Sequence, residues 1–388
     1  MQMTTKGFNF LRLILIVAGV SLICFFTKNL YFPKRHSIKL ISMFDDGNTR
    51  VKVEIQNFAQ EVKNLTNIDI KIVPYNKLPK QLPDSNDILK AVSEGTEYQM
   101  AFGSPYYWIK KIPEAVFFAS VPFGMHHEAL SNWVSPGKEG RNIWDSIYLN
   151  NGLDLKPFPF GMTGGQWGGI SSKEIKTLED FKGMYFRMPG LGGEVIKELG
   201  GIPFETGKFS ISTSKIEENA RSKECDKFID WIGVKEDKEL VLRNWAFCEG
   251  QEKKLYYYTN GWHERNTLFE LLINRTFYEQ ALDGITRERL ASIIEKYNYI
   301  IFSYYPEMNE LEYSKIRYLE NGQYNDIQIK FIPFSANLLS DLKNVYEKKV
   351  LREYLNKNKY CIPIFEKYKA YMEKNDDYYQ LNLRDHIE

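Results

Sequence analysis

The stretch 181–203 reads FKGMYFRMPGLGGEVIKELGGIP and specifies a strand, a tight turn and a helix in succession. The apolar residues at 184–188 predict a β-strand, which the Pro-Gly pair at 189–190 ends because proline cannot donate to a strand ladder. Residues 193–199 then predict a short helix that is closed by Gly200. A strand followed directly by a helix is typical of an α/β fold.

Arg187 lies at the carboxyl end of this predicted strand, just before the helix. A guanidinium in that place can hold a carboxylate through two parallel hydrogen bonds, and the amides of the helix N-terminus add positive potential. The alternative is a salt bridge at the protein surface. We interpret Arg187 as the anchor for an anionic solute.

Further towards the N-terminus, strands and helices alternate. Period-two patterns predict strands at 39–44, 68–72 and 98–102, and helical spacing of apolar residues predicts helices at 51–65 and 85–94. This order predicts an open α/β sheet with right-handed crossovers. Ligands bind beyond the carboxyl ends of the strands in such sheets, so the residues that follow each strand are the candidates for function.

Asp230 is a second charged residue near a strand end. It lies beside Trp231 in the otherwise apolar run 228–232, which predicts another strand. A carboxylate in such a strand is costly unless it is paired or binds a cation. Pairing with Arg187 and cation binding both remain open, and in either case the two residues are expected at the same sheet edge.

Two glycine clusters resemble nucleotide-binding loops but lack the residues that those loops need. The run 190–193 has Val195 where a dinucleotide fingerprint requires glycine, and 161–169 (GMTGGQWGG) has no Lys-Ser/Thr pair. Nucleotide binding is therefore excluded. Within the second cluster, Gln166 and Trp167 either present an amide and a ring to a solute or pack within a turn.

Aromatic residues make up 15% of the chain, a high share that suits either a core or a ligand cleft. One group is Tyr106, Tyr107 and Trp108, which follow the third predicted strand. Another is 256–258 together with Trp262-His263. Core packing and cleft lining are both open for each ring.

The composition excludes several classes of protein. With 388 residues, 43% hydrophobic, and 51 Lys plus Arg against 50 Asp plus Glu, the chain is neither disordered nor a polybasic nucleic-acid binder. Outside the N-terminal segment, an odd number of cysteines permits one bridge, Cys225–Cys248, but no complete disulfide framework. The run His126-His127-Glu128 lacks the spacing of a zinc site. No pattern indicates catalytic residues.

The N-terminal segment predicts export. An apolar run at 13–26 follows Lys6 and Arg12 and is short for a membrane-spanning helix, which is typical of a secretory signal. An uncleaved anchor is the alternative, because no small-x-small cleavage site follows. At the other end, an amphipathic helical stripe begins at Leu339 and is expected to continue until Pro363 interrupts it.

Three runs carry a resemblance to a known family: 106–125 (YYWIKKIPEAVFFASVPFGM), 181–203, and 256–274 (YYYTNGWHERNTLFELLIN). The chain resembles, over about 38–300, the solute-binding proteins of TRAP (tripartite ATP-independent periplasmic) transporters, in the branch that binds 2-oxo acids and related carboxylates. It differs from the family pattern in having Met162 in place of asparagine and Asp230 in place of glutamate.

The resemblance implies a two-lobed, periplasmic-binding-protein-like α/β fold with a ligand cleft between the lobes and long C-terminal helices. It implies lobe I at 36–160 plus about 265–305 and lobe II at 161–264 plus about 306–388, after a signal or anchor at 1–35. The implied solute contacts are Arg187, Gln166, Trp231, Tyr107, Trp108 and His263, and the implied ligands for sodium or calcium are Gln166, Asp230 and Trp231.

The expected function is the capture of a small organic acid in the periplasm and its delivery to a TRAP permease, without catalysis and without nucleic acid. A homodimer through the C-terminal helices is a further expectation from the resemblance. The alternative is a membrane-anchored, ligand-sensing receptor of the same fold, which the unclear cleavage site favours.

Overall fold

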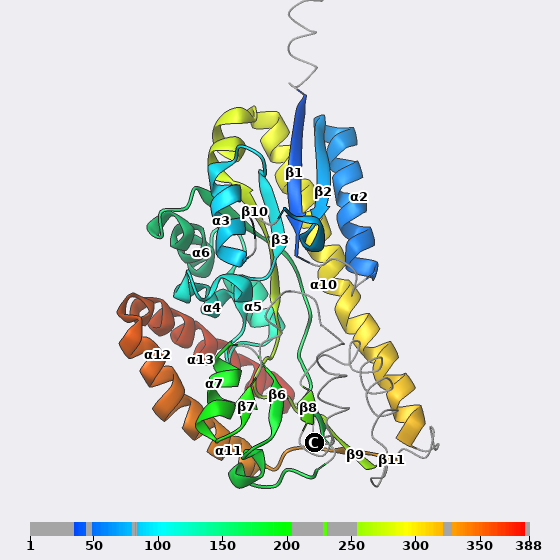
Figure 1. Ribbon diagram of the computed structural model, residues 1–388, viewed down its shortest axis with the longest axis vertical. Coiled ribbons are helices and arrows are strands. Elements are labelled where there is room, and N and C mark those ends of the chain that lie inside the picture. The colour runs from blue at the N-terminus through cyan, green and yellow to red at the C-terminus, as the bar shows by residue number, and fades with distance from the viewer. Residues whose placement is uncertain are drawn as a thin grey trace, which may run out of the picture.

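The protein is seen here in a computed structural model, which describes residues 35–43, 49–79, 82, 84–171, 173–188, 190–203, 228–230, 254–320 and 328–384. Its strands form two separate sheets, which lie one above the other in Figure 1. We call each sheet with the helices packed on it a lobe. The predicted α/β fold with two lobes and C-terminal helices is confirmed.

The first sheet has the strand order β2-β1-β3-β10-β4. Its strands are β1 (His36–Ser42), β2 (Ile68–Pro74), β3 (Met100–Gly103), β4 (Leu155–Met162) and β10 (Leu268–Asn274). The first three run parallel, as predicted, but β10 is antiparallel to both of its neighbours, so the sheet is mixed. Strand β10 joins the sheet more than a hundred residues after β4 in the sequence.

The helices of the first lobe are α2 (Thr49–Thr66), α3 (Ser85–Glu94), α4 (Val116–Ala119), α5 (His127–Trp133) and α6 (Glu139–Asn150), with the 3₁₀ turns η1 (Tyr75–Lys77), η2 (Pro105–Trp108) and η3 (Pro113–Ala115). Helix α3 has the predicted bounds because both ends are locally encoded. Asp84 accepts hydrogen bonds from the first amides, and Gly95 takes the left-handed conformation that ends the helix. On α2, Leu65, the last residue of the apolar pattern that predicts this helix, is 49% exposed.

The second sheet has the order β11-β9-β5-β8-β6-β7. Its strands are β5 (Gly169–Ser171), β6 (Tyr185–Arg187), β7 (Ile202–Pro203), β8 (Phe228–Asp230), β9 (Lys254–Tyr258) and β11 (Gln328–Ile332), accompanied by the turn η4 (Leu178–Phe181) and helix α7 (Gly190–Glu198). Helix α7 begins three residues before its predicted start at 193, which is therefore corrected. Burial of Leu191, Gly192 and Gly193 outweighs the low helix propensity of the glycines.

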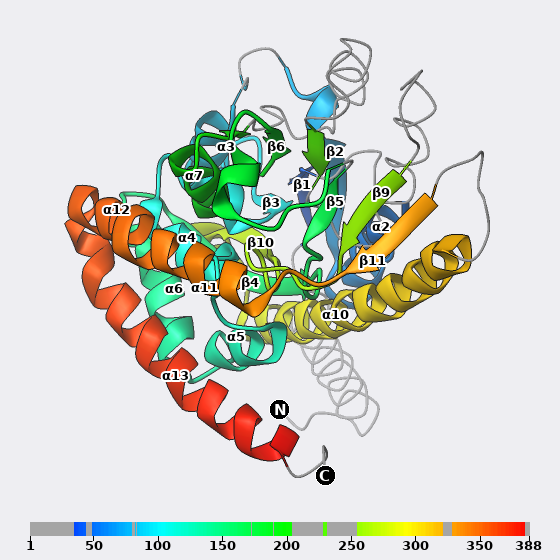
Figure 2. The same cartoon turned by 90° about the horizontal axis from the view of Figure 1, so that it is seen from below.

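The π-helix η6 (Phe277–Ala281) leads into α10 (Gly284–Glu320), which runs along both lobes (Figures 1 and 2). Helix α10 packs on α2 and β4 of the first lobe and, further along, on β11 of the second. Pro306 lies in its interior. The two lobes are thus connected by a helix as well as by loops.

The C-terminal region consists of α11 (Ala336–Val345), the π-helix η7 (Tyr346–Leu351), α12 (Arg352–Lys357), the turn η8 (Lys359–Cys361) and α13 (Ile362–Arg384). The amphipathic helical stripe that begins at Leu339 is interrupted at Asn358, five residues before the predicted interruption at Pro363. Pro363 does not interrupt it, because a proline in the first turn of α13 removes no intrahelical hydrogen bond. Helix α13 packs on α4, α5 and α6 (Figure 2), and Cys361 is a buried free thiol.

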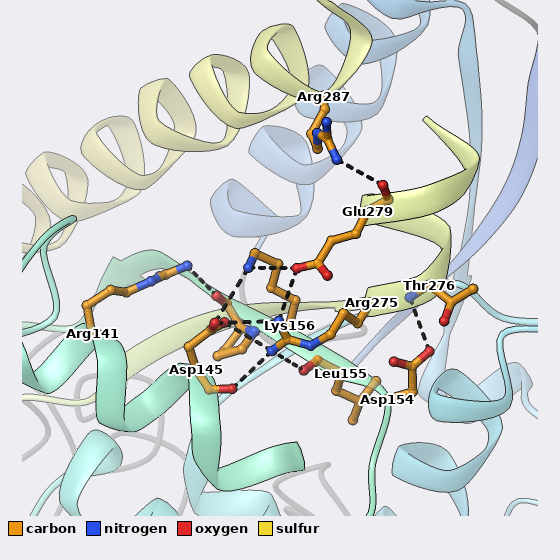
Figure 3. A network of polar contacts seen from close by, with 10 residues as sticks. Arg141, Asp145, Asp154, Leu155, Lys156, Arg275, Thr276, Glu279 and Arg287 are labelled. Atoms are coloured by element: carbon orange, nitrogen blue, oxygen red, sulfur yellow. Dashed lines mark hydrogen bonds and ion pairs between the residues drawn. The ribbon is translucent and has the colours of Figure 1, made fainter. Parts of the chain in front are cut away.

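A network of charged side chains joins α6, β4 and the end of β10 (Figure 3). Arg275 contacts Asp145 at 3.2 Å and Glu279 at 3.1 Å. Lys156 contacts the same two carboxylates at 3.5 and 3.1 Å. This network fixes the late-arriving strand β10 to elements that precede it by more than a hundred residues.

Some predictions fall outside the described residues. These are the signal or anchor predicted at 1–35, of which only residue 35 is described, the Cys225–Cys248 bridge and Trp231. Within the described ranges, no helix combines the length and the apolar character needed to cross a membrane. The predicted lobe boundaries stay a prediction.

Candidate functional site

Two chain segments cross side by side between the sheets. One runs from β4 to β5, and the other runs from β9 to β10. Backbone hydrogen bonds join them: Thr163 N–H donates to Thr267 O at 3.0 Å, and Gln166 N–H donates to Glu264 O at 3.0 Å. The crossing segments therefore place Gln166 and Glu264 together where the two lobes meet.

The side chain of Gln166 also faces Glu264. Its Nε2 donates to Glu264 Oε1 at 3.5 Å, while its Oε1 is buried and finds no hydrogen-bond partner among the described residues. Gly261 lies against the same backbone, where a Cβ would overlap the carbonyl oxygen of Gln166. An unpartnered amide oxygen beside a carboxylate is a suitable ligand for a hard cation.

Arg187 and Asp230 are the last residues of β6 and β8. These strands are parallel neighbours, and the two residues are directly opposite each other in register. The backbone therefore brings Arg187 and Asp230 to the same edge of one sheet, as the sequence predicts. Helix α7 begins three residues after Arg187, so its free N-terminal amides lie close to this edge along the chain.

Tyr106 approaches this edge from the first lobe. Its ring lies against Gly190, the first residue of α7, and its hydroxyl donates to Ser120 O at 3.3 Å. Burial, together with the negative charge of Glu264, raises the pKa of Tyr106 well above its ordinary value. The phenol therefore stays neutral at physiological pH.

The other predicted solute contacts occupy different surroundings. Trp108 is fully buried in the first lobe and donates its indole N–H to Glu270. Tyr107 is partly buried and meets Trp108 edge to face, with ring centroids 6.0 Å apart. His263 is buried in a crossing segment beside Trp262, and its Cβ lies against Gly192 of α7. Of these three, His263 is the one that contacts the second lobe's helix.

Glu270 is a buried acid that the sequence reasoning missed. It lies in β10 with no exposed surface, and Tyr148 donates to both of its oxygens at 2.9 and 2.7 Å. Burial raises its pKa to about 8, although the bonds from Tyr148 and Trp108 act in the opposite direction. The signal that drew attention to Asp230, an acid inside an apolar strand, is present here too.

In the described part of the chain, no three His, Cys, Asp or Glu residues gather closely enough to hold a metal ion. In the run His126-His127-Glu128, His126 caps α5 by accepting a hydrogen bond from Ala129 N–H. Gln166 lies next to Glu264 rather than within such a cluster. A cation here would need amide or backbone oxygens as well as carboxylates.

Comparison with known proteins gives a consistent picture. Residues 42–206 match the model of the family of bacterial extracellular solute-binding proteins, family 7 (DctP). The monocarboxylate 2-oxoacid-binding periplasmic protein of Nostoc sp. strain PCC 7120 is 26% identical over 322 residues, which are 82% of this chain and 79% of that protein.

Solved structures share the whole architecture. A TRAP periplasmic solute-binding protein from Pseudoalteromonas atlantica, with bound sodium and pyruvate, has a TM-score of 0.73 and 25% identity, covering 91% of this chain and 99% of its own. One from Colwellia psychrerythraea, with bound calcium and pyruvate, has a TM-score of 0.73 and 24% identity over the same shares.

The family consists of binding proteins, which accords with the expectation that the protein is not an enzyme. The family match covers β2, β3 and β4 of the first sheet and the β6–α7 unit, and the structural match covers both lobes. Over 42–206 the chain therefore matches family 7 of the bacterial extracellular solute-binding proteins, and over both lobes it is similar to solved solute-binding proteins of TRAP transporters.

Proposed function

We propose that the protein captures a small 2-oxo acid such as pyruvate in the periplasm and delivers it to a TRAP membrane permease. The observation that carries this proposal is the shared register of Arg187 and Asp230 at the ends of β6 and β8, just before α7. The Nostoc relative is named for monocarboxylate 2-oxoacids, and the two similar structures hold pyruvate, which supports this class of ligand.

Arg187 supplies the positive charge for the acid. A guanidinium binds a carboxylate through two parallel hydrogen bonds, and the N-terminal amides of α7 add to the attraction. A buried anion is costly without such a partner, so acids are selected over neutral solutes. The solute binds the closed arrangement of the lobes more tightly than the open one. Binding therefore shifts the equilibrium towards the closed arrangement.

Gln166, Asp230 and Trp231 would hold a sodium or calcium ion beside the acid. The buried, unpartnered Oε1 of Gln166 fits this role, because such cations take oxygen ligands. When bound, the ion would supply positive charge to the oxygens of the solute. Asp230 has a shorter side chain than the glutamate of the family pattern, so we expect weak cation binding.

A thermal-shift screen tests the proposal. Pyruvate, other 2-oxo acids, hydroxy acids and aromatic acids are added with and without sodium or calcium. A ligand at a hundred times its Kd stabilises the folded state by about 2.7 kcal/mol, so a binding acid raises Tm clearly. We expect 2-oxo acids to give the largest shift and the cation to increase it.

Arg187→Met is the decisive variant, with Arg352→Met on the exposed face of α12 as its control. Removing the guanidinium should weaken acid binding at least a hundredfold in calorimetry, because roughly 3 kcal/mol or more is lost when a buried charge loses its partner. Thermal stability without ligand should not fall. Unchanged affinity in Arg187→Met would refute the role of this residue.

Docking to the permease, tethering by an uncleaved N-terminal segment and dimerisation through the C-terminal helices are further parts of the proposal. A TRAP solute-binding protein from Bordetella bronchiseptica, 20% identical to this chain, was crystallised as a dimer. Sequencing the mature N-terminus tests the tethering, and measuring the mass in solution tests the dimerisation.

A further inference from the structure

Tyr106 reaches from the first lobe to the backbone of the second. A Cβ added to Gly190 would lie 2.8 Å from Cε1 and 3.5 Å from Cδ1 of this ring, which is too close for a real side chain. Gly190 also has a φ of +63°, which glycine adopts more readily than other residues. The ring therefore rests on a position that has no room for any other amino acid.

The ring is held from the first lobe at several points. Ser104 caps the η2 turn by accepting from Tyr106 N–H at 3.4 Å, and the phenol hydroxyl donates to Ser120 O. At the end of the η2 turn, Trp108 donates a hydrogen bond to Glu270, which also accepts one from Tyr148. A ring fixed at its backbone, its hydroxyl and the end of its turn cannot easily move aside.

Tyr106 also meets both parts of the proposed site. Its ring lies against Gly190, three residues beyond Arg187, and its phenol is close enough to Glu264, which accepts a hydrogen bond from Gln166, for that charge to act on it. A contact at this place fixes how closely the strand end that bears Arg187 can approach the first lobe.

We propose that Tyr106 is a specificity-determining residue, whose ring rests on Gly190 and so limits the size of the acid that the closed site accepts. This inference rests on the proposed function, because it takes Arg187 as the anchor of the acid. A small 2-oxo acid such as pyruvate fits within the spacing that the ring sets. A 2-oxo acid with an aromatic side chain needs the volume that the ring occupies.

The test is calorimetry with pyruvate and with 2-oxo-3-phenylpropanoate. Tyr106→Ala should increase the affinity for the aromatic acid relative to pyruvate about tenfold or more, since a change of even one methylene group in an apolar pocket alters affinity by about tenfold or more. Gly190→Ala should weaken pyruvate binding about tenfold, because the new methyl group pushes the ring and separates the lobes. Adding Tyr106→Ala to Gly190→Ala should restore most of the loss.

Gly183→Ala is the matched control, because Gly183 has a φ of +72° but nothing within 4 Å of an added Cβ. It should lower Tm through backbone strain and leave pyruvate affinity unchanged. If the double variant stays as weak as Gly190→Ala, or if Tyr106→Ala keeps the wild-type ratio of affinities, the inference is wrong. If the wild-type protein binds neither acid, both the proposed function and this inference are wrong. If it binds pyruvate, the results for the variants test the inference alone.

Discussion

Strand β10 of the first sheet and strands β6 and β8 of the second differ in length and in burial. All seven residues of β10 are buried, whereas β6 and β8 have three residues each and end at Arg187 and Asp230. A long strand with both faces covered contributes apolar burial and ladder bonds, while a short one ends early and leaves polar residues at the sheet edge. The comparison contrasts a fully buried strand, which contributes apolar burial, with short strands whose ends carry residues that we propose for recognition.

The largest expected effect comes from truncating one apolar side chain in each sheet and comparing the losses of stability. Leu271 in β10 has no exposed surface, whereas Ile202 in β7 is 43% exposed. Leu271→Ala should lower the free energy of unfolding by about 2–5 kcal/mol because it leaves a cavity. Ile202→Ala should change it by roughly 0.5 kcal/mol or less. Urea titration followed by circular dichroism measures both, and equal losses would contradict this difference in burial.

The second test uses the buried acid of β10. The pKa of Glu270 is raised to about 8 by burial, whereas an unfolded glutamate has a pKa of about 4.3. Between these values the folded protein holds a proton that the unfolded chain has released. The free energy of unfolding should therefore fall as pH rises from about 4.5 to about 8, by up to roughly 1.4 kcal/mol per pH unit, and level off above.

Glu270→Gln removes this contribution, because an amide does not titrate. The variant should gain stability over the wild type as pH rises from 5 to 8, measured by denaturant unfolding at each pH. Glu198→Gln, at an exposed position on α7 of the second lobe, is the control and should follow the wild-type curve. A constant difference between Glu270→Gln and the wild type across this range would show that Glu270 does not titrate there.

The smallest expected effect concerns ion pairs. Asp145 lies between Arg275 and Lys156, whose side chains are 13% and 19% exposed, whereas Lys349 in the Lys349–Glu198 pair is 62% exposed. Asp145→Asn should cost about 1 kcal/mol, and breaking the exposed pair should cost roughly 0.5 kcal/mol or less. Both costs should shrink in 1 M salt, where the screening length is about 3 Å. A larger loss at the exposed pair would contradict the comparison.

The sequence allowed the local features to be predicted, because their causes lie within a few residues. Helix α3 is set by Asp84 and Gly95, and the placement of Arg187 and Asp230 at strand ends follows from the apolar runs before them. The start of α7 was misplaced because tertiary burial outweighed the helix propensity of its glycines.

The remaining features depend on partners far away in the sequence. Glu270 is stabilised by Trp108, 162 residues earlier, and Tyr106 meets Gly190 across the lobes. Spacing within one sequence carries no signal for such pairs. The insertion of β10 between β3 and β4 is of the same kind, since hydrophobic pattern predicts a strand but not its neighbours.

This insertion also affects how the chain folds while it is being made. Among the residues that the structure describes, β4 pairs with β10 alone, so this ladder cannot form until 268–274 have left the ribosome. Closing so long a loop is slow, because its entropy must be lost before the contacts form. The nascent polypeptide therefore cannot complete its first sheet until 274 of its 388 residues have been joined, and until then its edge strands stay open to factors that bind unfolded chains.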